Sequence, residues 1–373
     1  GALARAHPRG VIACGPLDST PDLAEAILEL AAAARWPVLA EPTSQLRCGS
    51  HADGALVVSH ADALLRDAAF AAAHAPDVVL RFGSAPTSKA LRLWLERHAP
   101  PHVLLVDPDG GARDPSHLAS EVLRLDPAPL CSRLARAVAG ARSKPADARW
   151  LRAFEDAERR AAAAVERCLA ADDALLEPRV IRELGAALPD GALLYVSNSM
   201  PVRDLDGFLP RSPRRLRVLC NRGANGIDGM VSSALGAAAA HDGPSVLLTG
   251  DLALLHDLGG LYAARRHALA LTLVVLNNDG GGIFSYLPIA AHGDAVDFEA
   301  NFRTPHGLDF APACRTFGVR HTRVGSWEHL RFALKESLGS GCSSLIEVPI
   351  DRDRSLAHHR AIERAVADAL GGR

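Results

Sequence analysis

The sequence predicts an α/β fold made of two doubly wound parallel sheets. Short runs rich in valine and leucine alternate with amphipathic segments along most of the 373 residues. Such alternation is typical of parallel sheets with helices on both faces. The strand-like runs are apolar almost throughout, as expected where both faces of a sheet are covered. A long helical segment separates two such series, which indicates two domains.

The first series lies between residues 10 and 140. Residues 11–14 are predicted to form a strand, and residues 21–36 a helix, because apolar residues recur there at i, i+3 and i+4. Further elements are strands at 37–42, 77–83 and 102–108 and a helix at 88–99. We assign this first, Rossmann-like domain to residues 1–145.

The second series follows a long segment rich in Ala, Arg and Glu, at about 147–171, that is typical of a helix. A Pro-containing segment at 143–148 precedes it, which favours a linker, and we place that helical linker at 146–177. The second domain is then 178–373. Its expected elements are strands at 192–199, 216–222, 245–251, 271–279 and 343–350 and helices at 227–240 and 326–338.

Composition excludes several classes of protein. The net charge is −2 without a long basic run, which argues against a nucleic-acid-binding surface. No apolar run reaches the roughly 18 residues that a membrane span requires. The seven cysteines form no CxxC pair, so neither a zinc site nor a disulfide framework is indicated, and we expect a reducing, cytoplasmic compartment. His358 and His359 are predicted to be solvated rather than to bind metal.

The most informative segment runs from residue 250 to residue 288. Asp251 and Asn278 each follow a predicted strand, so their side chains should meet at the carboxyl edge of the sheet. Mg²⁺ prefers oxygen ligands and commonly shares them with a diphosphate, and a backbone carbonyl near Gly280 could be a third ligand. A helix expected to start near Leu254 would direct its N–H groups at the phosphates. The glycines at 280–282 allow a close approach of the backbone.

Glycines in this part of the chain also have other interpretations. Gly250-Asp251 alone is compatible with an ordinary Rossmann-like turn and a helix-capping aspartate. The glycines at 223, 226 and 229 form a GxxGxxG pattern, which differs from the GxGxxG of dinucleotide-binding proteins. A nicotinamide cofactor is therefore disfavoured.

Gly-Asp followed at this distance by Asn277-Asn278 resembles the signature of thiamine-diphosphate enzymes. Leu252 stands where the general signature has a glycine or another small residue. Gly250-Asp251-Leu252, followed by segments 256–261 and 280–288, resembles the SEPHCHC (2-succinyl-5-enolpyruvyl-6-hydroxy-3-cyclohexene-1-carboxylate) synthase family of menaquinone biosynthesis. Segments 197–206 and 221–238 are similar to the same family. The resemblance covers essentially the whole chain but only the family's middle and diphosphate-binding domains.

The resemblance implies thiamine diphosphate with Mg²⁺ or Mn²⁺, and specific residue roles. Asp251, Asn278 and Gly280 would hold the metal. Ser199, Arg203 and Arg222 would bind substrate carboxylates, although surface ion pairing is an alternative for the arginines. Lys89 matches a lysine that faces the substrate, but Ala90 stands where some members have arginine, which leaves this loop open. The implied cofactor-binding residues are Ile227, which would prop the bent cofactor, and Gly250, Asp251, Leu252, Ala253, Asn278, Gly280, Ile283, Phe284 and Leu287.

The implied reaction is decarboxylation of 2-oxoglutarate and addition of the resulting succinyl carbanion to isochorismate. Two alternatives are an acetolactate-synthase-like enzyme that uses pyruvate and FAD, and a non-catalytic cofactor-binding protein. The family's pyrimidine-binding domain, with its glutamate, is expected upstream of Gly1 or on a separate polypeptide, so this chain alone is predicted to be inactive. A homodimer or homotetramer is expected.

Overall fold

The computed structural model describes residues 2–111, 113–140 and 148–371. Residues 143–147 of the predicted Pro-containing segment lie outside this range. The contacts divide the chain into two compact units. Unit 1 comprises residues 1–170, 206–215 and 362–373, and unit 2 comprises residues 171–205 and 216–361.

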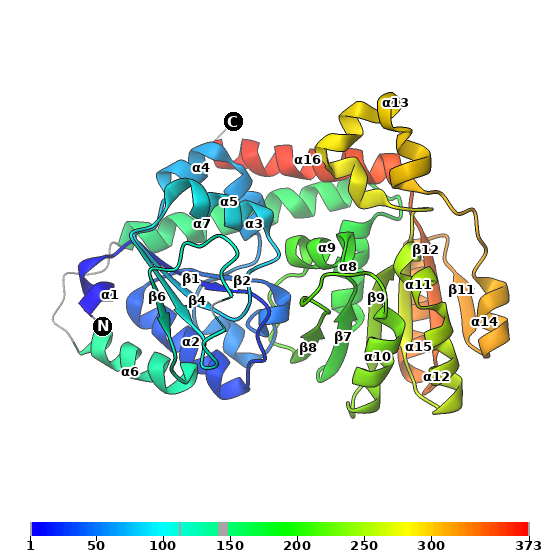
Figure 1. The fold of residues 1–373 in the computed structure, drawn as a ribbon, viewed down its shortest axis with the longest axis horizontal. Helices are drawn as coiled ribbons and strands as arrows, with labels where there is room; N and C mark the ends of the chain where they lie inside the picture. The colour runs from blue at the N-terminus through cyan, green and yellow to red at the C-terminus, as the bar shows by residue number, and fades with distance from the viewer. Residues whose placement is uncertain (1, 112, 141–147, 372–373) are drawn as a thin grey trace. The chain divides into compact units, whose positions relative to one another are not determined.

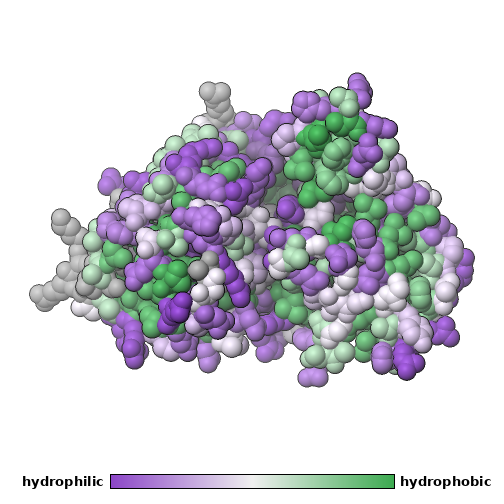
Figure 2. Space-filling model, viewed as in Figure 1, coloured by the Kyte–Doolittle hydropathy of each residue, from purple (hydrophilic) through white to green (hydrophobic). Residues whose placement is uncertain are grey.

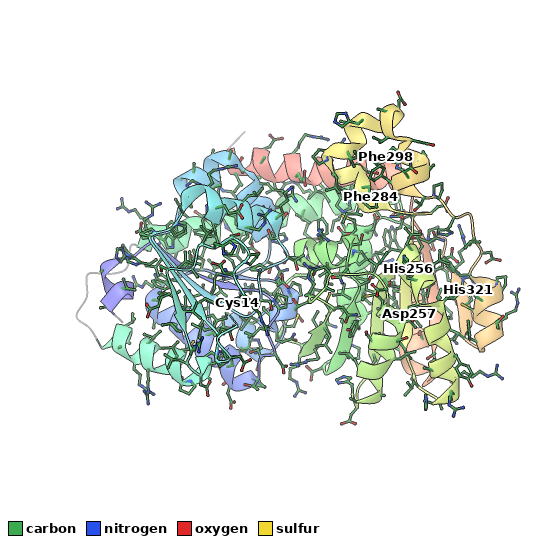
Figure 3. The ribbon with its side chains drawn as sticks, viewed as in Figure 1. Cys14, His256, Asp257, Phe284, Phe298 and His321 are labelled. Atoms are coloured by element: carbon green, nitrogen blue, oxygen red, sulfur yellow. The ribbon has the colours of Figure 1, made fainter. Side chains whose placement is uncertain are left out.

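Unit 1 contains a six-stranded sheet in which every strand pair is parallel (Figure 1). The strand order is β3-β2-β1-β4-β5-β6, which is the order of a doubly wound Rossmann-like sheet. β1 and β4 are fully buried, as expected of central strands, and β1 ends at Cys14 (Figure 3). The strands are β1 (Gly10–Cys14), β2 (Val38–Ala40), β3 (Val57–Val58), β4 (Val78–Phe82), β5 (His102–Val106) and β6 (Glu121–Leu123).

Side chains cap the starts of α2, α4, α5 and α6 in unit 1. The Thr20 side chain accepts a hydrogen bond from the N–H of Leu23, and Pro21 follows at the first helical position of α2. Arg35, with φ of 54°, ends this helix in the left-handed region. The helices are α1 (Ala2–Ala6), α2 (Pro21–Ala34), α3 (Ala61–Arg66), α4 (Ala68–Ala73), α5 (Lys89–His98), α6 (Pro127–Ala139) and α7 (Ala148–Ala171).

Unit 2 contains a second parallel sheet, with the strand order β11-β12-β10-β9-β7-β8. The chain leaves β7 towards β8 on one side and leaves β9 towards β10 on the other. Crevices between strands whose connections diverge in this way are the usual ligand sites of open α/β sheets. The strands are β7 (Ala192–Val196), β8 (Leu216–Leu219), β9 (Ser245–Gly250), β10 (Thr272–Asn277), β11 (Arg320–Arg323) and β12 (Ser344–Pro349).

Helices and single-turn segments precede, connect and follow these strands (Figure 1), and the last residues of α9 and α16 belong to unit 1. The α-helices are α8 (Glu177–Ala187), α9 (Met200–Phe208), α10 (Met230–Ala239), α11 (Asp251–His256), α12 (Leu261–Arg266), α13 (Gly293–Val296), α14 (Ala311–Phe317), α15 (Trp327–Gly339) and α16 (Arg352–Gly371). Between β10 and α14 lie the short turns η4 (Gly282–Tyr286), η5 (Pro288–His292) and η6 (Glu299–Arg303).

The two predicted parallel sheets are confirmed, with some local differences. Sequence patterns missed β3, β6 and β11, which are only two to four residues long. α10 begins at Met230 rather than at residue 227, because Gly229 adopts a positive φ angle of 67° that a helix interior does not contain. None of the helices in the described part of the chain combines the length and the apolar composition that a membrane span needs.

The prediction that His358 and His359 are solvated was wrong. Both side chains are buried, on α16. Nε2 of His359 lies 2.9 Å from Oδ1 of Asp204 on α9. The helical spacing of α16 could not reveal this, because the partner lies 155 residues away in the sequence.

Candidate functional site

A cavity of about 370 Å³ lies in unit 2, at the carboxyl ends of β7, β9 and β10. Its location at the divergence of β7 and β9 is where an open α/β sheet usually binds its ligand. The structure brings together here thirteen of the residues that the sequence singled out. They are Ser199, Arg203, Arg222, Ile227, Gly250, Asp251, Leu252, Ala253, Asn278, Gly280, Ile283, Phe284 and Leu287.

Asp251 is a buried carboxylate at this edge. Its Oδ1 accepts the N–H of Leu252 at 2.6 Å, and its Oδ2 accepts the N–H of Gly280 at 3.0 Å. Burial raises the pKa of Asp251, and the hydrogen bonds from Gly280 and Leu252 and the neighbouring His306 oppose this. A bound cation would offset the cost of keeping the charged form in this buried position.

The prediction that a helix starts near Leu254 was wrong. α11 begins at Asp251, directly after Gly250, whose extended φ and ψ of −88° and 166° end β9. The first turn of this six-residue helix therefore contains the carboxylate itself. The N–H of Leu252, which would otherwise point at a ligand, is donated to Asp251.

Asn278 lies on the neighbouring loop, after β10. Its Oδ1 is buried and has no hydrogen-bond partner among the described residues, although it borders the cavity. A buried amide oxygen without a partner costs free energy unless a ligand completes it. A divalent cation beside Asp251 would do so, and the donor set of carboxylate, amide and carbonyl oxygens suits Mg²⁺.

The glycines after Asn278 allow the backbone to pass very close to other chain segments. Gly280 has φ of 133°, and a Cβ atom there would lie 2.0 Å from the carbonyl oxygen of Arg303. A Cβ atom at Gly281 would lie 2.5 Å from the carbonyl oxygen of Phe302. Only glycine fits these positions, so the Gly280–Gly282 run holds the loop against Asp251.

The polar side of the cavity comes from α9 and from the loops after β7 and β8. Nη1 of Arg222 donates to Oδ1 of Asn198 at 2.8 Å, and Nε of Arg222 is buried without a hydrogen-bond partner among the described residues. Nη1 of Arg203 donates to the carbonyl oxygen of Ser199 at 2.5 Å. Ser199 has φ of 71°, a strained conformation for a residue with a side chain that is characteristic of functional sites.

The apolar side comes from η4 and its neighbours. The rings of Phe284 (labelled in Figure 3) and Phe302 lie 5.5 Å apart in an edge-to-face arrangement. Leu287 at the rim is 41% exposed. Figure 2 shows hydrophobic side chains gathered on the part of unit 2 that Figure 1 draws in yellow, around α13. Ile283, Phe284 and Leu287 give the cavity its apolar side, and Arg203 and Arg222 give it a cationic side.

Three residues that sequence reasoning missed contribute to the site. Asn198 borders the cavity, and its Nδ2 bonds the carbonyl oxygens of Asn221 and Gly226 at 2.8 and 2.7 Å, tying two loops together. Glu177 also borders the cavity, and His306 lies 3.3 Å from Asp251. Asn198 could have been found, because it follows a strand at the same sheet edge as Asp251.

Lys89 is not among the residues that form this cavity. It belongs to unit 1, where it is exposed as the first residue of α5. Ser88 caps that helix and donates to Oδ1 of Asp62 at 2.6 Å, so the start of α5 is well fixed. The neighbouring Ala90 is buried, a position at which a small apolar side chain fits.

The arrangement has the chemistry to hold a divalent cation together with an anionic ligand. No cluster of three His, Cys, Asp or Glu side chains that could hold a metal occurs among the described residues. A cation at Asp251 would therefore need amide and carbonyl oxygens in addition to the one carboxylate, and a diphosphate could supply further oxygens.

Comparison with known proteins agrees with this geometry. Residues 4–196, just over half of the chain, match the family described as the middle domain of thiamine pyrophosphate. The chain belongs to the thiamine pyrophosphate enzymes. Residues 208–348 match a second description within this group, the C-terminal TPP-binding domain of thiamine pyrophosphate enzymes. This match includes Asp251, Asn278 and Gly280.

Several curated proteins are similar over nearly all of this chain, and they are named 2-succinyl-5-enolpyruvyl-6-hydroxy-3-cyclohexene-1-carboxylate synthase. The protein from Myxococcus xanthus is 48% identical, over 98% of this chain and 61% of its own length. The protein from Geobacillus kaustophilus is 48% identical over 97% of this chain and 61% of its own length. The protein from Natronomonas pharaonis is 42% identical over 97% of this chain and 59% of its own length. The chain thus spans about 61% of the length of the first two. These names favour neither the acetolactate-synthase-like alternative nor a non-catalytic protein.

Proposed function

We propose that the cavity of unit 2 binds thiamine diphosphate through Mg²⁺ or Mn²⁺. Asp251, Asn278 and the carbonyl of Gly280 would hold the metal. The single observation that carries this proposal is the unpartnered, buried amide oxygen of Asn278, on the loop whose Gly280 N–H binds the buried carboxylate of Asp251 at 3.0 Å. Metal binding would satisfy the oxygen and compensate the charge together.

The remaining lining residues suit the other parts of this cofactor. Gly250, Leu252 and Ala253 border the cavity beside Asp251, where the diphosphate would lie. Ile227 would prop the cofactor's bent conformation, and Ile283, Phe284 and Leu287 would form the apolar wall around its thiazolium ring. When bound, the cofactor supplies the electron sink for decarboxylation, while the protein supplies position and electrostatics.

We propose further that this chain provides the middle domain (1–145) and the cofactor-binding domain (178–373) of a SEPHCHC synthase. Such an enzyme decarboxylates 2-oxoglutarate and transfers the succinyl unit to isochorismate. Both acids are polyanionic, and the cationic side of the cavity suits them: Ser199, Arg203 and Arg222 would bind and orient carboxylates through charge-assisted hydrogen bonds. Lys89, an oligomeric state of two or four subunits, and a cytoplasmic location stay predictions from the resemblance.

The metal site can be tested by calorimetry on the complete enzyme, meaning this chain together with the family's pyrimidine-binding part. We expect Asp251→Ala to weaken Mg²⁺-dependent binding of thiamine diphosphate at least about tenfold, because it removes the charged metal ligand. Asp251→Asn keeps the size of the side chain and should also weaken binding. Asp242→Ala, at an exposed position, is the control. Unchanged affinity in both Asp251 variants would contradict the assignment.

The substrate assignment has its own test. The complete enzyme should decarboxylate 2-oxoglutarate far faster than pyruvate and should consume isochorismate only when 2-oxoglutarate is present. Product formation can be followed by mass spectrometry. A preference for pyruvate would refute the SEPHCHC synthase proposal but leave the metal site standing.

A further inference from the structure

His306 contacts the proposed metal ligand Asp251 from a loop that sequence motifs did not single out. Its Nε2 lies 3.3 Å from Oδ2 of Asp251, the same oxygen that accepts the N–H of Gly280. The imidazole is largely buried, with 9% of its side chain exposed, and it packs against the ring of Phe310 at a centroid distance of 5.7 Å. The contact joins residues 55 positions apart.

The other ring nitrogen determines which nitrogen carries the hydrogen. Nδ1 of His306 accepts the backbone N–H of Leu308 at 3.0 Å. A neutral imidazole with Nδ1 as acceptor carries its hydrogen on Nε2. His306 therefore donates Nε2–H to the carboxylate of Asp251.

The backbone of His306 is itself held by the loop that contains Asn278. Oδ1 of Asp279 accepts the N–H groups of His306 and Gly307 at 3.0 and 2.8 Å. The N–H of Asp279 is bound in turn by Oδ1 of Asn277 at 3.1 Å, and Nδ2 of Asn277 donates to the buried carboxylate of Glu347 at 2.9 Å. A continuous series of hydrogen bonds therefore connects Asp251, through His306, with the segment Asn277–Asp279.

We propose that His306 is a positioning residue of the metal site, which fixes the carboxylate of Asp251 relative to Asn278. The proposal rests on the proposed function of this cavity. Second-layer hydrogen bonds of this kind orient metal ligands, and their loss typically lowers metal affinity about 10- to 100-fold. With Oδ2 of Asp251 held by two N–H donors, the carboxylate is fixed in one orientation, and its remaining acceptor positions can face the metal.

The test measures the dissociation constant of Mn²⁺ by electron paramagnetic resonance, in the complete enzyme with saturating thiamine diphosphate. His306→Leu should raise this constant about 10- to 100-fold. His306→Gln, whose amide nitrogen can occupy the position of Nε2, should stay close to the wild type. His306→Asn is too short to reach Asp251 and should behave like His306→Leu. His267→Leu, at an exposed position, is the control and should change nothing.

The outcomes separate the positioning role from a general structural role. Thermal unfolding without ligands should be similar for His306→Gln and His306→Asn, so that their difference in Mn²⁺ binding reports the hydrogen bond. Equal Mn²⁺ affinities of these two variants would overturn the proposal, even if His306→Leu does not fold. If the His306 variants bind Mn²⁺ like the wild type and Asp251→Ala binds it more weakly, the positioning role of His306 is refuted, while the proposed metal site at Asp251 is supported. If the wild type itself does not bind Mn²⁺ with thiamine diphosphate, the proposed function fails.

Discussion

The guanidinium of Arg222 reaches the cavity with only part of its donor capacity in use. Nη1 is bound to Asn198 at 2.8 Å, whereas Nε is buried without a partner among the described residues. Arg222 therefore bonds a neutral amide here rather than forming the surface ion pair that sequence reasoning left open. An unused buried donor beside a cavity is the arrangement expected of a group that awaits an anionic ligand.

We expect Arg203→Ala and Arg222→Ala each to raise the Michaelis constant for one of the two acids. A hydrogen bond to a charged group is worth roughly 1.5–3 kcal/mol, so the increase should be about 10- to 100-fold. Steady-state kinetics of the complete enzyme with 2-oxoglutarate and isochorismate varied in turn would measure it. Arg265→Ala, at an exposed position on α12, should have no effect. Unaltered constants in both cavity variants would assign these arginines a structural role.

At the scale of elements, α8, α9 and α16 meet around the buried imidazole of His359. Nε2 faces Asp204, and Nδ1 lies 2.9 Å from the carbonyl oxygen of Ser355 and 3.0 Å from the hydroxyl of Tyr286. Because a carbonyl only accepts, Nδ1 must carry a hydrogen, and a protonated ring also donates from Nε2 to the carboxylate of Asp204. Burial alone would lower the pKa of His359, but the carboxylates of Asp204 and Glu177 raise it to about 9.

This cluster predicts a loss of stability at alkaline pH. The pKa of His359 is higher in the folded protein than its ordinary value of 6.5, so its contribution is complete below about pH 6.5 and disappears as the pH rises through about 9. Burial is the main cause of the raised pKa of Glu177. This shift also makes the folded protein less stable as the pH rises, but it does so at a lower pH than His359. The melting temperature of the wild type should therefore fall over this interval.

His359→Gln should flatten that dependence, because the titrating group is gone. Differential scanning calorimetry between pH 6.5 and 9.5 would show it, with His329→Gln, an exposed position on α15, as the control. Equal pH slopes for the wild type and His359→Gln would show that His359 is not the group responsible.

At the scale of the whole molecule, unit 1 is assembled from three separate parts of the chain. Residues 206–215 return to it from unit 2, and Arg47 holds them. Its guanidinium donates to Oδ1 of Asp206 at 2.5 Å, to the carbonyl oxygens of Asp206 and Leu209 at 2.6 and 3.2 Å, and to that of Ala40 at 2.5 Å. The side chain is 2% exposed, so this pair is shielded from water.

Removal of Arg47 should destabilise unit 1 strongly. Arg47→Met leaves Asp206 and three carbonyl groups buried without their donor, and breaking a buried ion pair costs about 3–5 kcal/mol. Hydrogen exchange of β1 and β2 amides in denaturant would report the free energy of unfolding of unit 1. Arg92→Met, which breaks an exposed pair with Glu96, should lower the free energy of unfolding far less, because water screens that pair. Similar losses in the two variants would contradict this account.

The sequence by itself determined the fold class and most of the cavity lining. Strands of a parallel sheet are recognisable because they are continuously apolar, and the residues that follow them must gather at one edge. This rule alone places Asp251 and Asn278 together, although they are far apart along the chain. The glycines around residue 280 could also be interpreted from the sequence, because only a residue without Cβ permits the close backbone contacts found there.

Only the tertiary structure decided the partners of these residues. His306 lies on a loop without a local pattern, and its contact with Asp251 exists because Asp279 binds the backbone of that loop. The burial of His359 depends in the same way on helices that are distant in the sequence. Hydrophobic periodicity and sequence motifs indicate the local structure of a segment, over a few neighbouring residues. Hydrogen bonds between loops depend instead on how whole elements pack, and that packing decides which residues surround the proposed metal site.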